Sequence, residues 1–377
     1  ERPSASQIVS ITSAPEFTHL QDSIMLDQKS CYAASSSTTA RKLGSLQGNQ
    51  ELWLASKLDS MVSSETQINV LDANQSGWVK HFIRKEKLAD SVTSMITVHD
   101  AVWVGTSQGE IHSYSTSSYR NLFSYHIDSG TENPSPVRSL HFIKSSGRVV
   151  VALNNGRIFL CRSDKIPVNS SGEEGSFILT ELGTSGTVYC ISSILMSDNR
   201  IEVWCGQSQS GIAIFSLVDS VVTSQDIVGH KLEMGEVMQI ISTDNNKSVF
   251  SYLYPGCIIY QWNPCTKLII AKLDCTKLIP CSESLKTINI DDQFSPGRCQ
   301  VSTLEAVGNL LYIGTCWGCL VVAETANLSP VTVFRPFNEE IQSLVSFNPV
   351  VGKQHLVSLG RGYRNLISRY CTTSEDC

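Results

Sequence analysis

Residues 150–161 read Val-Val-Ala-Leu-Asn-Asn-Gly-Arg-Ile-Phe-Leu-Cys, so that two apolar runs flank the dipeptide Asn155-Gly156. Asn-Gly between two apolar runs is a strong signal for a β-hairpin, because the tight turn needs residues that tolerate a positive φ angle. In the first run two bulky residues are followed by the small Ala152. A bulky pair, a small residue, a polar turn and a second strand therefore make up one predicted unit.

The same unit recurs along the chain in seven copies, each with a small residue after two bulky ones. The small residues, at intervals of 44 to 63 positions, are Ala55, Gly105, Ala152, Cys205, Ser251, Gly314 and Ser358. In six copies a glycine follows four to six positions later, as Gly109, Gly156, Gly211, Gly256, Gly318 and Gly362. Each of these glycines is predicted to lie in a hairpin turn at positive φ.

Further strands flank the predicted hairpins. A strand after the turn is expected at residues 111–114, 158–161, 212–215, 258–262 and 320–323, and one before the hairpin at 29–34, 91–95, 136–140, 187–191, 236–240, 300–304 and 340–344. Short alternating runs of this kind favour strands over helices. Several strands in a repeat of roughly 45 to 50 residues are typical of a β-propeller, so the sequence predicts an all-β, seven-bladed propeller.

Two features of the blades follow from this prediction. The small residue of each unit is expected where neighbouring blades pack closely. Residues 23–28 are expected to form an N-terminal strand that completes the last blade beside residues 356–370, so that one blade takes strands from both ends of the chain.

Composition limits the class of protein. The 377 residues are 41% hydrophobic and 17% charged, which is too apolar for a disordered chain and too uncharged for a coiled coil. A net charge of −6 argues against nucleic-acid binding. No signal-peptide pattern opens the sequence, so the 13 cysteines are expected to be reduced thiols of a cytoplasmic protein. The charge-free residues 306–323 reach membrane-spanning length, but the repeat divides them into two strands.

Two short motifs resemble catalytic or metal sites. Residues 105–109 match the G-x-S-x-G nucleophile elbow, yet a strand follows where that motif needs a helix, so a hairpin turn is predicted instead. Cys316 and Cys319 form a C-x-x-C pair, and a zinc site would need a second pair such as Cys275 and Cys281. Buried, apolar cysteines are favoured here, with the metal site as the alternative. No catalytic, cofactor-binding or metal-binding residue is predicted.

Traces of a known repeat are present. Gly229-His230, followed by Val237, is similar to the Gly-His opening of a WD repeat. Trp262-Asn263 and Leu71-Asp72 stand where such a repeat ends in Trp-Asp. Since most units lack the aspartate usual in the hairpin turn, the resemblance is to a degenerate WD repeat.

A second resemblance covers most of the chain. Arg2-Pro3-Ser4 resembles the R-P-[ST] segment that opens the last helix of a protein-kinase C-lobe, where the arginine commonly pairs with an A-P-E glutamate that this chain lacks. Together with residues 90–93, 295–298 and 311–315, this opening resembles the C-terminal end of the leucine-rich-repeat kinases of the Roco family. The resemblance implies a short helical kinase remnant at residues 1–15 and a WD-type propeller at residues 16–377.

The resemblance also implies a function. The parent would be a large cytoplasmic protein with a Roc-type GTPase, a COR dimerisation region and a serine/threonine kinase, and ATP, Mg²⁺ and GTP would bind only in those other domains. This chain would be a non-catalytic module for protein interaction and weak self-association that packs near the kinase. It would support recruitment to vesicle membranes or cytoskeleton, with no nucleic-acid partner and no membrane span.

Five loop residues are the candidate contacts. Gly297 and Arg298 precede the sixth blade, and Arg361, Tyr363 and Arg364 lie at the last hairpin. Arginine and tyrosine are favoured at interface hot spots, whereas the alternative for each residue is an ordinary solvated loop.

Alternatives remain for the function and for the end of the chain. One is a trafficking or exchange-factor scaffold from outside the Roco family, and another is a stand-alone propeller enzyme. Because relatives can continue into a further closing strand and a long C-terminal helix, residues 366–370 are either a shortened closing strand or part of a truncated propeller.

Overall fold

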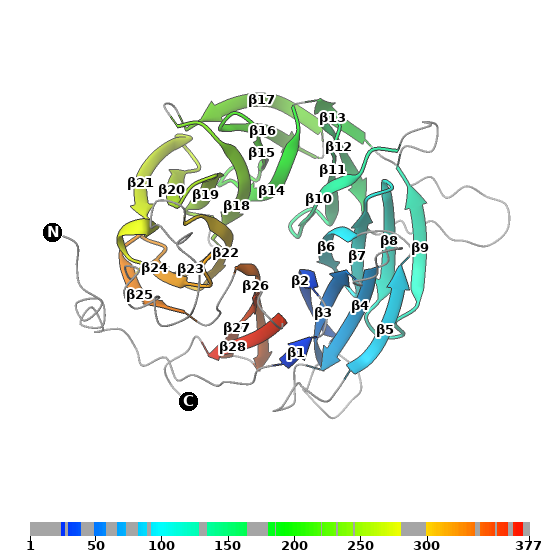
Figure 1. Ribbon diagram of the computed structural model, residues 1–377. Coiled ribbons are helices and arrows are strands. Elements are labelled where there is room, and N and C mark those ends of the chain that lie inside the picture. Colours follow the sequence, from blue (N-terminus) through cyan, green and yellow to red (C-terminus); the bar gives the residue numbers. More distant parts are fainter. Residues whose placement is uncertain are drawn as a thin grey trace. The chain divides into compact units, whose positions relative to one another are not determined.

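The computed structural model describes sixteen segments of the chain. They are residues 24–26, 29–38, 49–57, 66–72, 82–88, 92–127, 134–163, 180–184, 186–219, 221–230, 233–243, 246–279, 299–335, 340–350, 353–360 and 365–371. Within these residues, 28 strands form seven four-stranded antiparallel sheets, which Figure 1 shows. The contacts group the chain into two compact units, Gln28–Gly229 and His230–Cys377 with Glu1–Asp27.

The unit Gln28–Gly229 contains four sheets, each built from four consecutive strands. These are β2 (Lys29–Thr38), β3 (Asn49–Lys57), β4 (Thr66–Asp72) and β5 (Phe82–Leu88); β6 (Val92–Val98), β7 (Ala101–Thr106), β8 (Glu110–Ser115) and β9 (Asn121–His126); β10 (Val137–Ile143), β11 (Arg148–Leu153), β12 (Arg157–Arg162) and β13 (Thr180–Thr184); and β14 (Val188–Leu195), β15 (Ile201–Gln207), β16 (Gly211–Val218) and β17 (Val221–Gly229). The first strands of successive sheets are in contact, β2 with β6, β6 with β10, and β10 with β14.

The other unit contains three sheets and a 3-10 turn, η3 (Cys275–Lys277). Its strands are β18 (Glu236–Ser242), β19 (Val249–Tyr254), β20 (Ile258–Asn263) and β21 (Leu268–Asp274); β22 (Val301–Val307), β23 (Leu310–Thr315), β24 (Leu320–Glu324) and β25 (Pro330–Phe334); and β26 (Ile341–Val350), β27 (Lys353–Gly360), β28 (Asn365–Cys371) and β1 (Ile24–Leu26). Here too β18 contacts β22, and β22 contacts β26.

The last sheet takes strands from both ends of the chain. β1 pairs antiparallel with β28, with Ile24 opposite Ile367 and Leu26 opposite Asn365. This confirms the N-terminal strand expected at residues 23–28. The predicted first, second and third strands of the repeat also appear, while the helix expected at residues 1–15 lies outside the described residues and stays a prediction.

The turn glycines are confirmed in part. Gly109, Gly156 and Gly318 have φ angles of 76°, 90° and 70° in their hairpin turns. Gly211 does not: Gln209 and Ser210 hold the positive φ angles of 56° and 62°, and Gly211 begins β16. The reason is its offset of six positions, which places this glycine after the two residues of the turn.

Gly256 also departs from the expected positive φ, since no positive φ occurs there. A Cβ atom on Gly256 would lie 2.8 Å from the carbonyl oxygen of Leu253. This position therefore needs a glycine for space and not for its backbone angle. Gly362 lies outside the described residues.

Four of the small residues, Gly105, Ala152, Cys205 and Gly314, lie where neighbouring sheets pack together, as expected. A Cβ atom on Gly105 in β7 would lie 2.5 Å from Cγ1 of Val137, which begins β10 of the next sheet. Ala152 and Cys205, at the corresponding positions of β11 and β15, are fully buried in one apolar cluster. In the units whose side chains are described, the bulky residues before the small one are buried in the core, and the small residue leaves space for the adjacent strand.

The charge-free residues 306–323 fold as strands. They run from the end of β22 through β23 into β24, so they are core hairpin rather than a continuous apolar helix. Within the part of the chain that the structure describes, no helix has the length and apolar character needed to cross a membrane.

Candidate interaction surface

The five contact residues predicted from the sequence cannot be placed. Gly297, Arg298, Arg361, Tyr363 and Arg364 all lie outside the described residues, as does Arg2. Their roles as contacts therefore stay predictions.

The G-x-S-x-G match is a hairpin turn between β7 and β8, as predicted. The Gly109 N–H donates to the carbonyl oxygen of Thr106 at 3.2 Å. The buried Thr106 hydroxyl accepts from the N–H groups of Gln108 and Glu110, both at 3.3 Å. Since β8 follows directly, Ser107 has no helix behind it and lacks the geometry of a nucleophile elbow.

The clustered cysteines lie in the core between β18–β21 and β22–β25. Cys257, Cys275, Cys299 and Cys319 are buried among apolar side chains, and Cys316 packs against them. This confirms the favoured prediction of buried, apolar cysteines. Cys281 lies outside the described residues, and within those residues no group of three or more His, Cys, Asp or Glu side chains is placed to hold a metal ion.

Thiol contacts and burial determine how these cysteines ionise. A hydrogen bond with Cys275 raises the pKa of Cys257. In the same way, a hydrogen bond with Cys257 raises the pKa of Cys299, and one with Cys299 raises the pKa of Cys316. Burial adds to each of these three increases. Burial also raises the pKa of Cys319 to about 11. All four thiols are therefore protonated at neutral pH and weak nucleophiles, because the thiolate is the reactive form.

Cysteine reactivity should follow this burial. Of the nine cysteines whose side chains are described, Cys265, in the turn between β20 and β21, is the exposed one. We expect N-ethylmaleimide to modify Cys265 within minutes in the native chain and the buried cysteines only after unfolding. Peptide mass spectrometry of native and urea-treated samples measures this difference. Rapid native labelling of Cys257 or Cys299 would contradict the burial of the cluster.

A buried polar cluster at the sheet β18–β21 contains His230 and Trp262, two of the residues that resemble a WD repeat. The indole N–H of Trp262 donates to the Ser251 hydroxyl at 2.8 Å, and His230 Nε2 lies 3.0 Å from the same oxygen. The His230 ring also packs edge-on against Tyr260 and Trp262, with centroid distances of 4.6 and 5.0 Å. Ser251 is the small residue of this repeat unit, so the cluster stabilises the sheet from within.

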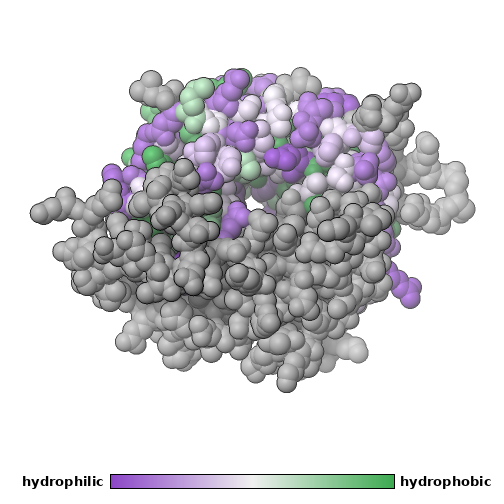
Figure 2. All heavy atoms as spheres, viewed as in Figure 1, coloured by the Kyte–Doolittle hydropathy of each residue, from purple (hydrophilic) through white to green (hydrophobic). Residues whose placement is uncertain are grey.

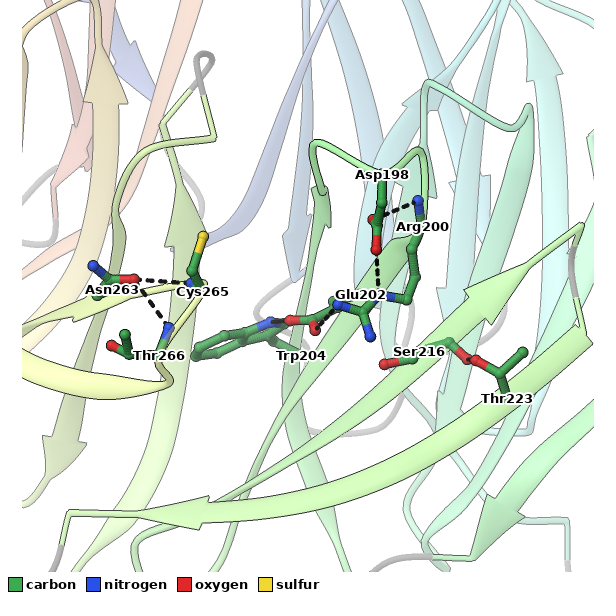
Figure 3. A network of polar contacts seen from close by, with 9 residues as sticks. All are labelled: Asp198, Arg200, Glu202, Trp204, Ser216, Thr223, Asn263, Cys265 and Thr266. Atoms are coloured by element: carbon green, nitrogen blue, oxygen red, sulfur yellow. Dashed lines mark hydrogen bonds and ion pairs between the residues drawn. The ribbon is translucent and has the colours of Figure 1, made fainter.

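A second buried cluster, in the unit Gln28–Gly229, was not predicted from the sequence. Glu202 and Trp204 are two positions apart on β15, so their side chains lie on the same face. The Trp204 indole N–H donates to Glu202 Oε2 at 3.1 Å, and Arg200 Nη2 lies 3.8 Å from Glu202 Oε1 (Figure 3). Arg200 Nε also lies 3.5 Å from an Asp198 carboxylate oxygen. The only signal in the sequence is an acidic residue inside an otherwise apolar run.

The exposed apolar side chains include pairs on two outermost strands. On β17, Val221 and Ile227 are 65% and 72% exposed, and on β21 Leu268 and Ile270 are 56% and 55% exposed. On the face that Figure 2 shows, hydrophilic residues cover most of the described surface and hydrophobic ones form small patches. Neither strand has a fifth neighbour in its sheet among the described residues. Unpaired edges of this kind can accept a strand from another chain.

The two strands differ in charge. β21 carries Lys272 in its exposed row, and the Lys272 Nζ atom lies 2.6 Å from Glu233 Oε1 and 5.0 Å from the centroid of the Tyr260 ring. Lysine on an edge strand disfavours pairing with another strand. β17 is longer, with nine residues, and its one charged residue is Asp226. Of the two edges, β17 is the better suited to pair with a partner.

Comparison with known proteins agrees with this fold. The chain is 24% identical over 355 residues to leucine-rich repeat serine/threonine-protein kinase 1 of Caenorhabditis elegans, and the aligned region covers 91% of this chain and 14% of that protein. The structure of Raptor from Chaetomium thermophilum is similar in fold, with a TM-score of 0.65 at 13% identity over the whole of this chain and 30% of that one. Residues 23–376 match the family model described as the LRRK2 beta propeller, and the chain therefore belongs to that family of propeller domains.

Proposed function

We propose that this chain is the seven-bladed, non-catalytic propeller of a leucine-rich-repeat serine/threonine kinase, and that it serves in protein interaction and weak self-association. Three observations support the number of seven blades. Seven four-stranded sheets occur in the described residues, and within each unit the first strands of successive sheets are in contact. In addition, the last sheet takes its fourth strand, β1, from the other end of the chain. Membership of the LRRK2 propeller family argues against a scaffold from outside that family.

The observation that carries the interaction role is the exposed edge of β17. Eight of its nine residues pair with β16 along one side, from Gly211 opposite Gly229 to Val218 opposite Val221. The other side presents main-chain N–H and C=O groups beside Val221 and Ile227. A second copy of the chain, or a strand of another protein, can extend the sheet there by main-chain hydrogen bonds.

The proposed role of this propeller depends on the larger protein to which it belongs. The chain aligns with about 14% of the worm kinase. We propose that a kinase and a GTPase, with their ATP, Mg²⁺ and GTP sites, lie in other regions of the parent protein. We propose that the propeller packs near the kinase in the same cytoplasmic protein and supports its recruitment to vesicle membranes or cytoskeleton. Gly297, Arg298, Arg361, Tyr363 and Arg364 stay the proposed loop contacts, and Arg2 the proposed link to the kinase.

Sedimentation of the purified chain tests this function. From sub-micromolar to tens of micromolar concentration we expect a reversible monomer–dimer equilibrium. Val221→Gln combined with Ile227→Gln removes the exposed apolar side chains of β17 and keeps its main-chain groups. We expect the dimer dissociation constant to rise roughly tenfold or more, because each buried aliphatic side chain contributes about 1.5 kcal/mol or more to an interface.

The matched control makes the same change on the other edge. Leu268→Gln combined with Ile270→Gln on β21 is expected to leave the dissociation constant within about twofold of that of the unmodified chain. Equal weakening by both pairs of substitutions would contradict a specific role for β17. A monomer at every concentration would remove self-association and leave other proteins as the partners.

A further inference from the structure

The outer edge of β17 is regular only from Ser224 onward. β17 is the outermost strand of the sheet β14–β17 (Figure 1), and from Ser224 to Gly229 each of its residues lies opposite one residue of β16. At Thr223 the register shifts, and the Thr223 hydroxyl donates to the carbonyl oxygen of Ser216 at 3.1 Å. A β-bulge of this kind bends the strand and disrupts its ladder, so a further strand can pair continuously only with residues 224–229.

The regular part of this edge combines an exposed apolar side chain with a single charge. Ile227 is 72% exposed, and the neighbouring Gln225 and Asp226 are exposed as well. Ile227 lies opposite Ala213 of β16, so these two side chains share one face of the sheet, whereas Asp226 lies on the other face. Such an edge favours an apolar partner at Ile227 and disfavours a second carboxylate opposite Asp226.

A second copy of the chain can pair with this edge about a two-fold axis. Residues that lie directly opposite each other in an antiparallel pair point to the same face of the sheet. Two copies of one strand meet this condition only when the axis passes through a residue, which then lies opposite its own symmetry mate. Within residues 224–229, only an axis through Asp226 or through Ile227 leaves two residues on either side of the centre and hence five opposed pairs.

Charge decides between these two registers. An axis through Asp226 places two carboxylates directly opposite each other, and like charges at opposed positions destabilise an antiparallel pair. An axis through Ile227 places Ile227 opposite its symmetry mate and Asp226 opposite Val228. The two aspartates are then diagonal neighbours, separated by about 7–8 Å, which is close to the distance over which physiological salt screens exposed charges. The register through Ile227 is therefore the favoured one.

We propose that β17 pairs antiparallel with β17 of a second copy of this chain, about a two-fold axis at Ile227. The pairing rests on the proposed self-association and gives it a surface and a register. The ladder runs from Gln225 to Gly229, and the two Ile227 side chains cover each other at its centre. Because a single pair of short strands covers far less than the roughly 1,600 Å² of a standard interface, the dimer is weak and needs a high local concentration.

Single substitutions separate this register from pairing along the whole of β17. Ile227→Gln alone should raise the dimer dissociation constant in sedimentation roughly tenfold or more, since it removes both side chains at the centre. Val221→Gln is the matched control, because Val221 is also exposed but lies beyond the bulge. It should leave the constant within about twofold of that of the unmodified chain. Equal weakening by the two substitutions would overturn the register.

A charge placed on the axis tests the two-fold symmetry. Ile227→Asp brings two carboxylates directly opposite each other, whereas Ile227→Asn has nearly the same shape without the charge. With sedimentation extended to hundreds of micromolar, we expect the aspartate variant to dimerise roughly fivefold more weakly than the asparagine variant, and less so at high salt. Since residue 227 is exposed in the monomer, both variants should melt at similar temperatures. Equal dissociation constants would contradict an Ile227 that lies opposite itself.

Disulfide cross-linking identifies the opposed residues directly. The starting chain is Cys265→Ser, because Cys265 is the exposed cysteine among those described, and its own cross-linking gives the baseline. Under mild oxidation, Ile227→Cys should form a linked dimer roughly tenfold faster than Gln225→Cys, because only residue 227 meets its own mate at disulfide distance. Linkage between Ile227→Cys and Gln225→Cys in a mixture would assign the register through Asp226 and overturn the proposal.

The two levels of the proposal fail in different ways. A dimer in sedimentation that does not cross-link at residue 227 would overturn the β17 register and leave self-association through another surface. A monomer at every concentration would remove the β17 pairing together with self-association.

Discussion

Replacing Gly314 by alanine is expected to lower the free energy of unfolding by about 1 to 3 kcal/mol, and by valine to lower it further. A Cβ atom there would lie 2.7 Å from Thr303 Cγ2 and 2.9 Å from Ile341 Cγ2. Thr303 lies in β22 of the same sheet, and Ile341, which is fully buried, begins β26 of the next sheet. Both side chains are β-branched and stiff, so the clash has to be relieved by moving strands apart.

Urea denaturation followed by circular dichroism measures the effect as a shift in midpoint at unchanged slope. Gly105→Ala is the equivalent substitution in the other unit, where the Cβ atom would meet Val137 at 2.5 Å. Gly211→Ala is the matched control, because its Cβ atom would come no closer than 3.6 Å to other atoms and the position has no positive φ angle. Equal stability of all three variants would refute close packing of the sheets at the small residues.

Glu202→Ala is expected to lower the free energy of unfolding by about 3 to 5 kcal/mol. Glu202 and Trp204 are both fully buried, and the substitution removes the acceptor of the Trp204 indole N–H together with the carboxylate that faces Arg200. A buried donor without an acceptor keeps its desolvation cost. The loss therefore exceeds that of an ordinary truncation.

Two further variants separate the contribution of the indole hydrogen bond from that of the ion pairs to the free energy of unfolding. Glu202→Gln keeps an oxygen that can accept from Trp204, so it should cost clearly less than Glu202→Ala. Asp198→Ala removes a carboxylate whose side chain is 60% exposed, and we expect less than about 1 kcal/mol from it. Urea unfolding monitored by tryptophan fluorescence gives all three values. Equal costs for the alanine and glutamine variants at position 202 would show that the indole hydrogen bond contributes nothing.

Much of the fold could be predicted because its signals are local. The Asn155-Gly156 turn, the small residue before it and the apolar runs on either side depend on near neighbours in the chain, and the structure confirms each of them. The offset of Gly211 shows the limit of such a pattern. A glycine at nearly the same place in the repeat was expected at positive φ, but the pairing of β15 with β16 puts Gln209 and Ser210 in the turn instead.

The proposed interaction surface could not be predicted from local sequence patterns, because it depends on contacts between distant parts of the chain. The outermost strand β17 contains both polar and apolar residues, and their exposure depends on whether another strand covers them. Glu202 resembles an ordinary charged residue until Trp204 is found to donate to it.

The sequence by itself determined the repeat, the strand-rich class, the shared last sheet and the positions where only a small residue fits. These follow from alternation, turn sterics and spacing, which act over a few residues. Only the tertiary structure decided which outermost strand exposes apolar side chains, which cysteines are buried together, and that His99 lies within hydrogen-bond distance of Ser163. Those juxtapositions arise when sheets far apart in the chain pack against each other, and the burial, charge and hydrogen bonding of each side chain depend on that packing.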